Sequence, residues 1–317
     1  MPLKHALITG GSRGIGLSIA QLLARNNYAC TLISRSSSMS SLHAALSSLS
    51  IPSSSSTQTE NPHAVLRGDI ASQNFWTQDT FKAMKERTKR FDVVVNCAGI
   101  TQAKLFARMD ESEIREIVDT NLTAMMIGTR FLLRNRWLQS SSPSSRRDKQ
   151  KGQEDESADK GGEEGRTHTP VIVNIASLMG VSGGFGAVAY AASKAGVLGF
   201  TRALATEMGG NGGVRVNAVV PGYVETDMTR SSEDFLLFVV ICKAYDKLRC
   251  KEGTAPRLTT RTPFEFSTDL NRSELLRRIP LGRFAKPEEI ASAALFLAQN
   301  EYAHNCIINL DGGISAL

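Results

Sequence analysis

The sequence predicts an α/β fold, in which one doubly wound parallel sheet carries helices on both faces. Short apolar runs such as Phe91–Val95 and Val171–Ile175 are typical of strands buried on both faces. These strands alternate with helical patterns along the chain, which favours parallel strands joined by right-handed crossovers. A glycine-rich turn between the first strand and the first helix adds the third feature of a Rossmann-like fold. Residues 1–317 are therefore expected to form a single domain of this kind.

The composition is that of a globular protein. The 317 residues can bury a substantial core, and 41% of them are hydrophobic. The formal net charge of +6 either favours an acidic or phosphorylated partner or serves only for solubility. We expect no nucleic-acid partner. No apolar run approaches the ~20 residues of a membrane-spanning helix, so no membrane span is expected either.

The five cysteines show none of the spacings that are typical of metal ligands. They stand at positions 30, 97, 242, 250 and 306, and their odd number and scatter suit free thiols in a reducing compartment. The first predicted strand begins directly after Lys4, which leaves no room for a cleavable presequence. We therefore expect no metal site, and a location in the mitochondrial matrix or the cytoplasm.

A glycine-rich turn follows the first predicted strand, His5–Thr9. Its glycines, Gly10, Gly14 and Gly16, precede an amphipathic helix predicted at Leu17–Arg25. Backbone N–H groups at a helix N-terminus attract negative charge, and glycine lets the backbone approach a ligand closely. The turn is therefore a candidate cradle for the phosphates of a dinucleotide.

The second predicted strand, Tyr28–Ser34, bears on the choice of cofactor. Folds that bind NAD often place an acid about 20 residues past the glycines, where it binds the ribose 2′-hydroxyl. This chain has Arg35 instead, with Arg13 in the glycine turn. A guanidinium pairs with phosphate through two hydrogen bonds, so both residues suit the 2′-phosphate of NADPH. The alternative is a solvated basic pair; we favour NADPH.

The next part of the chain predicts further strands and helices around the same edge of the sheet. Residues 36–63 are serine-rich with three leucines at helical spacing, which predicts a short helix and then a loop. The third strand is predicted at Ala64–Ile70, with Asp69 a candidate for binding the adenine amine. A helix is predicted at Asn74–Lys89.

The fourth strand, Phe91–Val95, ends at Asn96-Cys97-Ala98-Gly99, where small residues let a cofactor lie close to the backbone. A long helix is predicted at Glu111–Leu138. It contains Asn121, a residue type that inside a helix is usually a mild defect or a polar contact. Residues 140–169 are polar and almost without apolar side chains, which predicts an inserted disordered loop.

Three residues form a candidate catalytic set. Ser177 stands just past the predicted strand Val171–Ile175, and Tyr190 and Lys194 are four apart on one face of an alanine-rich helix. A nearby ammonium favours the phenolate and so lowers the pKa of a tyrosine, which is ordinarily about 10. A serine hydroxyl can add a hydrogen bond to a carbonyl oxygen. Such a set could protonate an alkoxide. The alternative is that Tyr190 and Lys194 are ordinary surface residues.

The C-terminal part predicts a strand at Val214–Val220, a helix that begins at Pro287 and a last strand at Cys306–Leu310. Residues 231–272 do not fit this pattern. They are either a substrate lid or intron sequence translated by a faulty gene model, and the sequence favours neither.

Together these motifs resemble the short-chain dehydrogenase/reductase family, in family order and at family spacing. The resemblance covers roughly residues 3–35, 64–137, 170–230 and 273–313. Within the family, the motifs are most similar to those of 3-oxoacyl-[acyl-carrier-protein] reductases and eukaryotic carbonyl reductases. The motifs are Thr9-Gly10, Gly14, Gly16, Asn96-Cys97-Ala98-Gly99, Asn121, Ser177, Tyr190, Lys194 and Pro221-Gly222.

The resemblance implies reduction of a ketone to a secondary alcohol with NADPH. Tyr190 would donate the proton, Lys194 would lower its pKa and bind the nicotinamide ribose, and Ser177 would orient the carbonyl. Asn121 would kink its helix and hold a water that relays protons to Lys194. The residues implied to contact the cofactor are Gly10, Ser12, Arg13, Gly14, Ile15, Gly16, Arg35, Asp69, Ile70, Asn96, Ala98, Gly99, Tyr190, Lys194, Pro221, Gly222, Val224 and Thr226.

The preferred substrate is a 3-oxoacyl thioester on acyl carrier protein, as in fatty acid synthesis. The alternative enzyme is a broad reductase of ketones, quinones or sugars. An alternative of another class is a dinucleotide-binding regulator without turnover, against which the catalytic set argues. The resemblance also implies a homo-oligomer, a tetramer. Because acyl carrier proteins are acidic, we expect a basic docking patch near the active-site mouth, with Arg130 and Arg134 as candidates; pairing with the helix C-terminal dipole is the alternative.

Overall fold

The computed structural model describes residues 3–35, 39–50, 61–139, 169–211, 213–230, 273 and 275–316. The predicted insertion at 140–169, apart from Thr169, and the atypical segment at 231–272 lie outside these residues, as does most of the loop expected after the short serine-rich helix.

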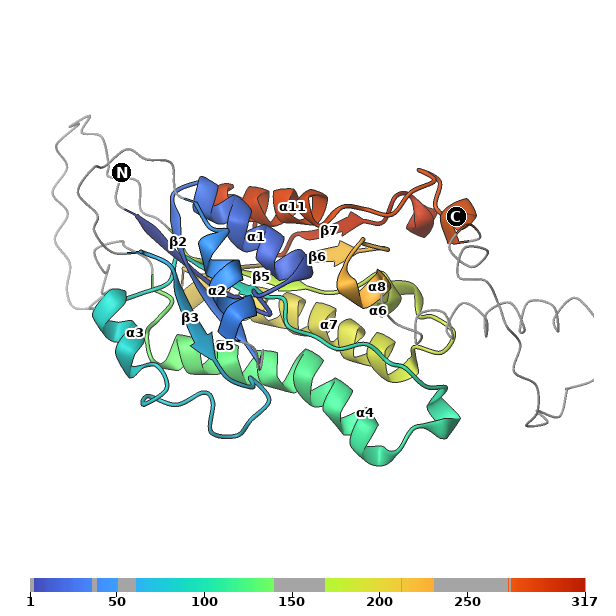
Figure 1. The fold of residues 1–317 in the computed structure, drawn as a ribbon, viewed down its shortest axis with the longest axis horizontal. Coiled ribbons are helices and arrows are strands. Elements are labelled where there is room, and N and C mark those ends of the chain that lie inside the picture. The colour runs from blue at the N-terminus through green and yellow to red at the C-terminus, as the bar shows by residue number, and fades with distance from the viewer. Residues whose placement is uncertain are drawn as a thin grey trace, which may run out of the picture.

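The centre of the fold is a seven-stranded parallel sheet in the order β3-β2-β1-β4-β5-β6-β7 (Figure 1). The strand order reverses between β1 and β4, so the chain is doubly wound, as the alternation of strands and helices predicts. The strands are β1 (Lys4–Thr9), β2 (Tyr28–Ser34), β3 (Ala64–Arg67), β4 (Val93–Asn96), β5 (Val171–Ile175), β6 (Arg215–Pro221) and β7 (Ile307–Leu310).

Helices cover both faces of the sheet because alternate side chains of each strand are apolar on both sides. Ile8 and Val95 face a cluster that includes α1 (Gly14–Arg25) and α11 (Pro287–Gln299). Leu7 faces the cluster that includes α5 (Ala124–Arg134) and α7 (Val188–Asn211). Figure 1 shows α1 and α11 on one side of the sheet, and α4, α5 and α7 on the other. The structure also has the helices α2 (Met39–Ser47), α3 (Lys82–Arg87), α4 (Glu111–Val118), α6 (Met179–Ser182), α8 (Asp227–Arg230), η1 (Phe106–Arg108), η2 (Asp119–Thr123) and η3 (Ile314–Ala316).

The helix predicted at Asn74–Lys89 is wrong for its first half, since only Lys82–Arg87 is helical. The neighbouring aromatic residues Phe75 and Trp76 both pack into one aromatic cluster, with their ring centroids 5.0 Å apart. Trp76 also donates a hydrogen bond from Nε1 to the carbonyl of Ile70, 3.0 Å away. Trp76 packs on Phe131 of α5, and Phe75 is buried beside it, so tertiary packing holds this segment in turns and overrides the helical pattern.

The long helix predicted at Glu111–Leu138 is divided. A π-helical turn, η2 (Asp119–Thr123), separates α4 from α5, and it contains Asn121. The helix ends at Arg134, and Trp137 then accepts a hydrogen bond of 2.7 Å at its carbonyl from the N–H of Phe91. That contact places the end of α5 at the edge of the sheet where β4 begins, because α5 runs back along the strands.

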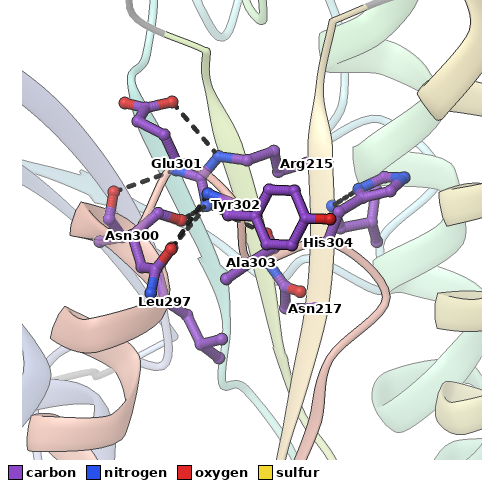
Figure 2. Close-up of polar contacts among 10 residues, drawn as sticks. Arg215, Asn217, Leu297, Asn300, Glu301, Tyr302, Ala303 and His304 are labelled. Carbon is purple, nitrogen blue, oxygen red and sulfur yellow. Dashed lines mark hydrogen bonds and ion pairs between the residues drawn. The ribbon is translucent and has the colours of Figure 1, made fainter.

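A buried arginine anchors the end of α11 to the sheet. Arg215, only 4% exposed, reaches from β6 to the turn that follows α11 (Figure 2). Its Nη1 donates hydrogen bonds to the carbonyls of Leu297 (2.7 Å) and Asn300 (2.9 Å), and its Nη2 donates to Ala298 (3.1 Å). The last carbonyls of a helix have no partners within it, so Arg215 acts as a cap supplied by another element. Among the described helices, none is long and apolar enough to cross a membrane.

Candidate active site

A cavity of about 940 Å³ lies at the carboxyl edge of the sheet, beside the point where the strand order reverses. The glycine turn forms one wall, and the segments that follow β4, β5 and β6 form others. The N-terminal part of α7 brings Tyr190 and Lys194 to the same cavity. The fold therefore brings the predicted phosphate cradle and the predicted catalytic set together in one space.

The glycine turn is shaped for close contact with a ligand. Gly10 has a φ of +68°, and a Cβ there would lie 2.9 Å from the Cα of Ala98. A Cβ on Gly16 would lie 2.3 Å from the carbonyl oxygen of Gly10. Thr9 Oγ1 accepts hydrogen bonds from the N–H groups of Cys97 (3.0 Å) and Ala98 (3.1 Å), which ties the ends of β1 and β4 together. The first N–H groups of α1 carry no side-chain cap, so this turn fits the phosphates of a dinucleotide.

Arg35 lies at the far end of the cavity, where the sequence predicts a 2′-phosphate contact. Its Nη1 is 3.7 Å from Asp69 Oδ2 and 4.0 Å from Glu116 Oε1. The Asp69 carboxylate also accepts a hydrogen bond from the N–H of Ala71, and its side chain does not line the cavity. Arg35 is therefore already paired with two carboxylates, which reduces the charge it presents to an anion. The exposed Arg13 lines the cavity as well.

Tyr190 and Ser177 share a hydrogen bond between their side chains. Burial raises the pKa of Tyr190 above its ordinary value, the hydrogen bond from Ser177 opposes the rise, and the nearby Cys97 adds to it. That Lys194 lowers the pKa of Tyr190 stays a prediction. Tyr190 keeps its proton at neutral pH, which is the form that a general acid requires.

Lys194 is 5% exposed and is held in one direction. Its Nζ donates a hydrogen bond of 2.9 Å to the carbonyl of Ile175, the last residue of β5, and lies 5.9 Å from the centroid of the Tyr190 ring. Burial lowers the pKa of Lys194 to about 8, with an opposing contribution from Cys97. A Cβ on Gly99 would come within 3.4 Å of the same Nζ, so a larger residue would crowd the amine.

Asn121 is not one of the residues that line the cavity. Its Oδ1 accepts a hydrogen bond from the N–H of Ile100 (2.8 Å), and its Nδ2 donates to the carbonyl of the same residue (2.9 Å). Nδ2 also donates to Ser193 Oγ (3.0 Å), which in turn donates to the carbonyl of Tyr190 (2.7 Å). Asn121 thus fixes the loop after β4 against α7. The water relay that the resemblance implies stays a prediction.

The structure brings most predicted site residues to the cavity wall and leaves three outside it. These three are Asp69, Asn96 and Asn121. Asn96 turns away from the cavity, because its side chain is buried and its Nδ2 donates to Asn174 Oδ1 at 2.8 Å. The predicted residues in the wall are Gly10, Ser12, Arg13, Gly14, Ile15, Gly16, Arg35, Ile70, Ala98, Gly99, Ser177, Tyr190, Lys194, Pro221, Gly222, Val224 and Thr226.

Sequence reasoning missed Gln102, whose side chain is 6% exposed and lines the cavity. It also missed the apolar residues Met179, Phe185 and Met228, which line the cavity. A single glutamine in a loop carries no pattern, and only its position three residues after Gly99 could have drawn attention to it.

The docking patch expected at Arg130 and Arg134 is not near the active-site mouth. Both residues lie toward the end of α5, and α5 ends at the edge of the sheet where the strands begin. The cavity lies at the opposite edge. Among the described residues, no three His, Cys, Asp or Glu side chains are grouped so that they could hold a metal ion. The described cysteines, Cys30, Cys97 and Cys306, are free thiols.

The chain matches the family described as short chain dehydrogenase over residues 4–142 and 165–236. The matched ranges contain the glycine turn, Ser177, Tyr190 and Lys194.

Several curated proteins are similar along almost their whole length. The chain is 30% identical over 316 residues to 3-oxoacyl-[acyl-carrier-protein] reductase FabG of Chlamydia muridarum, covering 98% of this chain and 97% of that protein. It is 29% identical over 311 residues to carbonyl reductase family member 4 of Xenopus tropicalis, covering 98% of each. Among solved structures, an actinorhodin polyketide ketoreductase with NADPH is 25% identical, with a TM-score of 0.70 over 99% of this chain and 98% of that one.

Proposed function

Because the chain belongs to the short-chain dehydrogenase family, we propose that it reduces a ketone to a secondary alcohol and that NADPH supplies the hydride. One observation carries the proposal. The hydrogen-bonded pair of Ser177 and Tyr190, with the buried amine of Lys194 beside it, opens onto the same cavity as the glycine turn.

The residues of the cavity fit a dinucleotide. The glycine turn and the N-terminus of α1 would hold its phosphates, and Arg35 and Arg13 would hold a 2′-phosphate. The segment after β6, from Pro221 to Thr226, would border the nicotinamide. Support for NADPH over NADH comes from the two arginines and from the similar polyketide ketoreductase, whose structure was solved with NADPH.

The side chains divide the work at the carbonyl. Ser177 Oγ accepts a hydrogen bond from the N–H of Met179 (3.2 Å), and when a ketone binds, the Ser177 proton that points to Tyr190 would be donated to the substrate oxygen instead. Tyr190 gives its proton to that oxygen as negative charge develops there. The Lys194 ammonium then stabilises the phenolate that remains, and its hydrogen bond to Ile175 keeps it from turning away. Because these side chains lie in a buried setting of low dielectric constant, the electrostatic interactions between them are stronger than they would be in water.

The proposed substrate is a 3-oxoacyl thioester on acyl carrier protein. The similar protein of Chlamydia muridarum is named as a reductase of that substrate. Met179, Phe185 and Met228 add apolar side chains to the cavity wall, which suits an acyl chain. The second candidate is a carbonyl reductase of broad specificity, which the name of the Xenopus protein favours. The homo-oligomer and the mitochondrial or cytoplasmic location remain predictions.

Oxidation of NADPH by the purified protein tests the function. The panel holds a 3-oxoacyl thioester on acyl carrier protein, the same acyl group on a small thiol, a diketone and a quinone. A preference for the carrier-bound thioester by kcat/KM supports the proposed substrate, and a preference for the diketone or quinone supports the second candidate. No turnover with any of them, while NADPH still binds, would point to a dinucleotide-binding regulator.

A further inference from the structure

The catalytic helix begins without a cap of its own. Val188 is the first residue of α7, and the residue before it is Ala187, whose methyl group cannot accept a hydrogen bond. The first turn of α7 contains no acidic residue. The first N–H groups of a helix have no partners within it, and alanine is among the poorest residues at the capping position. The start of α7, which carries Tyr190 as its third residue, therefore needs an acceptor from elsewhere.

Gln102 supplies that acceptor from a loop 87 residues away in sequence. Its Oε1 accepts hydrogen bonds from the N–H of Ala189 at 2.8 Å and from the N–H of Tyr190 at 3.4 Å. These are the second and third residues of α7, the two positions that a capping side chain normally serves. The other end of the amide is also fixed, because Nε2 donates to the carbonyl of Lys104 at 2.7 Å. The amide thus has its donor and acceptor in defined directions.

The loop that carries Gln102 is held at a second point. Asn121 binds both the N–H and the carbonyl of Ile100, two residues before Gln102. Asn121 also reaches α7 through Ser193. The short segment from Ile100 to Gln102 therefore joins the π-helical turn to the first turn of the catalytic helix, and its residues Thr101 and Gln102 line the cavity.

We infer that Gln102 is a positioning residue for the reaction: by capping α7 from outside, it fixes Tyr190 relative to Ser177. The inference rests on the proposed reductase function. A misplacement of about 1 Å at a reacting group can cost about 10²-fold in rate, so a cap on the residue that bears the acid has a direct kinetic consequence. Gln102 acts through the backbone of Tyr190 and needs no contact with the ketone.

Two substitutions separate the acceptor from the rest of the side chain. Gln102→Met keeps the length and removes the acceptor; we expect kcat for ketone reduction to fall about 10- to 100-fold, while the Kd for NADPH is unchanged. Gln102→Glu keeps the acceptor and places a favourable negative charge at a helix N-terminus, but it loses the hydrogen bond from Nε2 to Lys104, so kcat should fall clearly less than in Gln102→Met. Gln299→Met, a change of the same type at an exposed position on α11, is the matched control and should leave kcat unchanged.

The charge of the Gln102→Glu variant gives a readout that a purely structural role would not move. A carboxylate beside Tyr190 disfavours its phenolate and raises its pKa further. Oxidation of the alcohol, the reverse reaction, needs the phenolate, so its pH midpoint should move upward in this variant. The pH midpoint of alcohol oxidation by Gln102→Glu can be measured even if Gln102→Met does not fold. An unchanged midpoint would contradict the placement of Gln102 against Tyr190.

Restoring a local cap tests the mechanism itself. Ala187→Ser in the Gln102→Met background supplies a hydroxyl at the capping position of α7, and we expect it to recover most of the lost kcat. Wild-type kcat in Gln102→Met, or equal losses in Gln102→Met and Gln102→Glu, would overturn the inference. Failure of the proposed function can be told from failure of this inference. If the unchanged protein reduces no ketone, the proposed function is wrong. If the unchanged protein is active and Gln102→Met has the same kcat, only the positioning role of Gln102 is wrong.

Discussion

The amine of Lys194 donates a hydrogen bond of 2.9 Å to the carbonyl of Ile175, at the end of the strand that precedes Ser177. This contact crosses from the catalytic helix to the end of β5, and it holds a buried cation next to the candidate acid. Because burial lowers the pKa of Lys194 to about 8, its charge is lost just above neutral pH.

The pH dependence of reduction follows from that pKa. Lys194 acts as the ammonium, so we expect kcat to be level below its pKa of about 8 and to fall as pH rises through that value. Tyr190 does not set this limit, because its pKa is raised and its reactive form is the protonated one. The measurement is kcat against pH at saturating NADPH. Lys194→Arg, which stays charged, should remove the fall near this pH; a fall that persists would assign it to another group.

Cofactor choice depends on Arg35. Losing a charge-assisted hydrogen bond to phosphate costs about 1.5–3 kcal/mol, so Arg35→Asp should lower kcat/KM for NADPH about 10- to 100-fold and leave NADH little changed. Arg25→Asp, an exposed change of the same kind at the end of α1, is the control. A wild-type protein that uses both cofactors equally well at low salt would contradict the role of Arg35.

Arg35 is expected to strengthen the binding of NADPH, and Glu116 should weaken it. Its carboxylate is 4.0 Å from Arg35 Nη1, on the exposed side of the pair, and competes with a phosphate for the same cation. An exposed ion pair is worth about 0.2–1 kcal/mol, so Glu116→Gln should lower the KM for NADPH by about 1.5- to 5-fold. The KM for NADH, which has no 2′-phosphate, should not change. Equal shifts for both cofactors would mean that Glu116 acts on the fold instead.

Arg215 stabilises the fold through its hydrogen bonds to carbonyl groups at the end of α11. Arg215→Met leaves the carbonyls at the end of α11 without their donor in a buried setting, which should cost about 3 kcal/mol or more of unfolding free energy. Arg202→Met on the exposed face of α7 should change it by less than about 0.5 kcal/mol. Chemical denaturation of both variants measures the difference; similar stabilities would show that water replaces the guanidinium.

Most of the fold could be predicted because burial on both faces of a parallel sheet leaves a continuous apolar signal in each strand. The helix predicted at Asn74–Lys89 failed because Phe75 is buried and the half-buried Trp76 packs on Phe131 of α5, a tertiary preference that helical periodicity does not express. The hydrophobic periodicity of the sequence could not predict the π-helical turn at Asn121 either, because Asn121 is held by the backbone of Ile100 in a distant loop.

Site residues could be predicted where the residue type itself indicates a function. They were missed where the outcome depends on the direction of a side chain or of a helix. The period of two along β4 puts Asn96 on the same face as Val94, toward the buried Asn174, and the motif alone does not show this. The docking patch failed for a similar reason: the helix after β4 returns along the strands, so Arg130 and Arg134 end far from the carboxyl edge. Gln102 had no sequence signal, because its partners are backbone N–H groups of another element.

The central claim is that Tyr190 is the acid of an NADPH-dependent ketone reductase, and single-turnover reduction by Tyr190→Phe tests it most directly. The variant keeps the ring and loses the hydroxyl, and positioned proton transfer is worth about 10²–10⁴-fold, so the rate of alcohol formation should fall by that factor. The Kd for NADPH should be unchanged, since the ring still fills its place in the cavity wall. A Tyr190→Phe protein that reduces the ketone at nearly the wild-type rate would contradict the account.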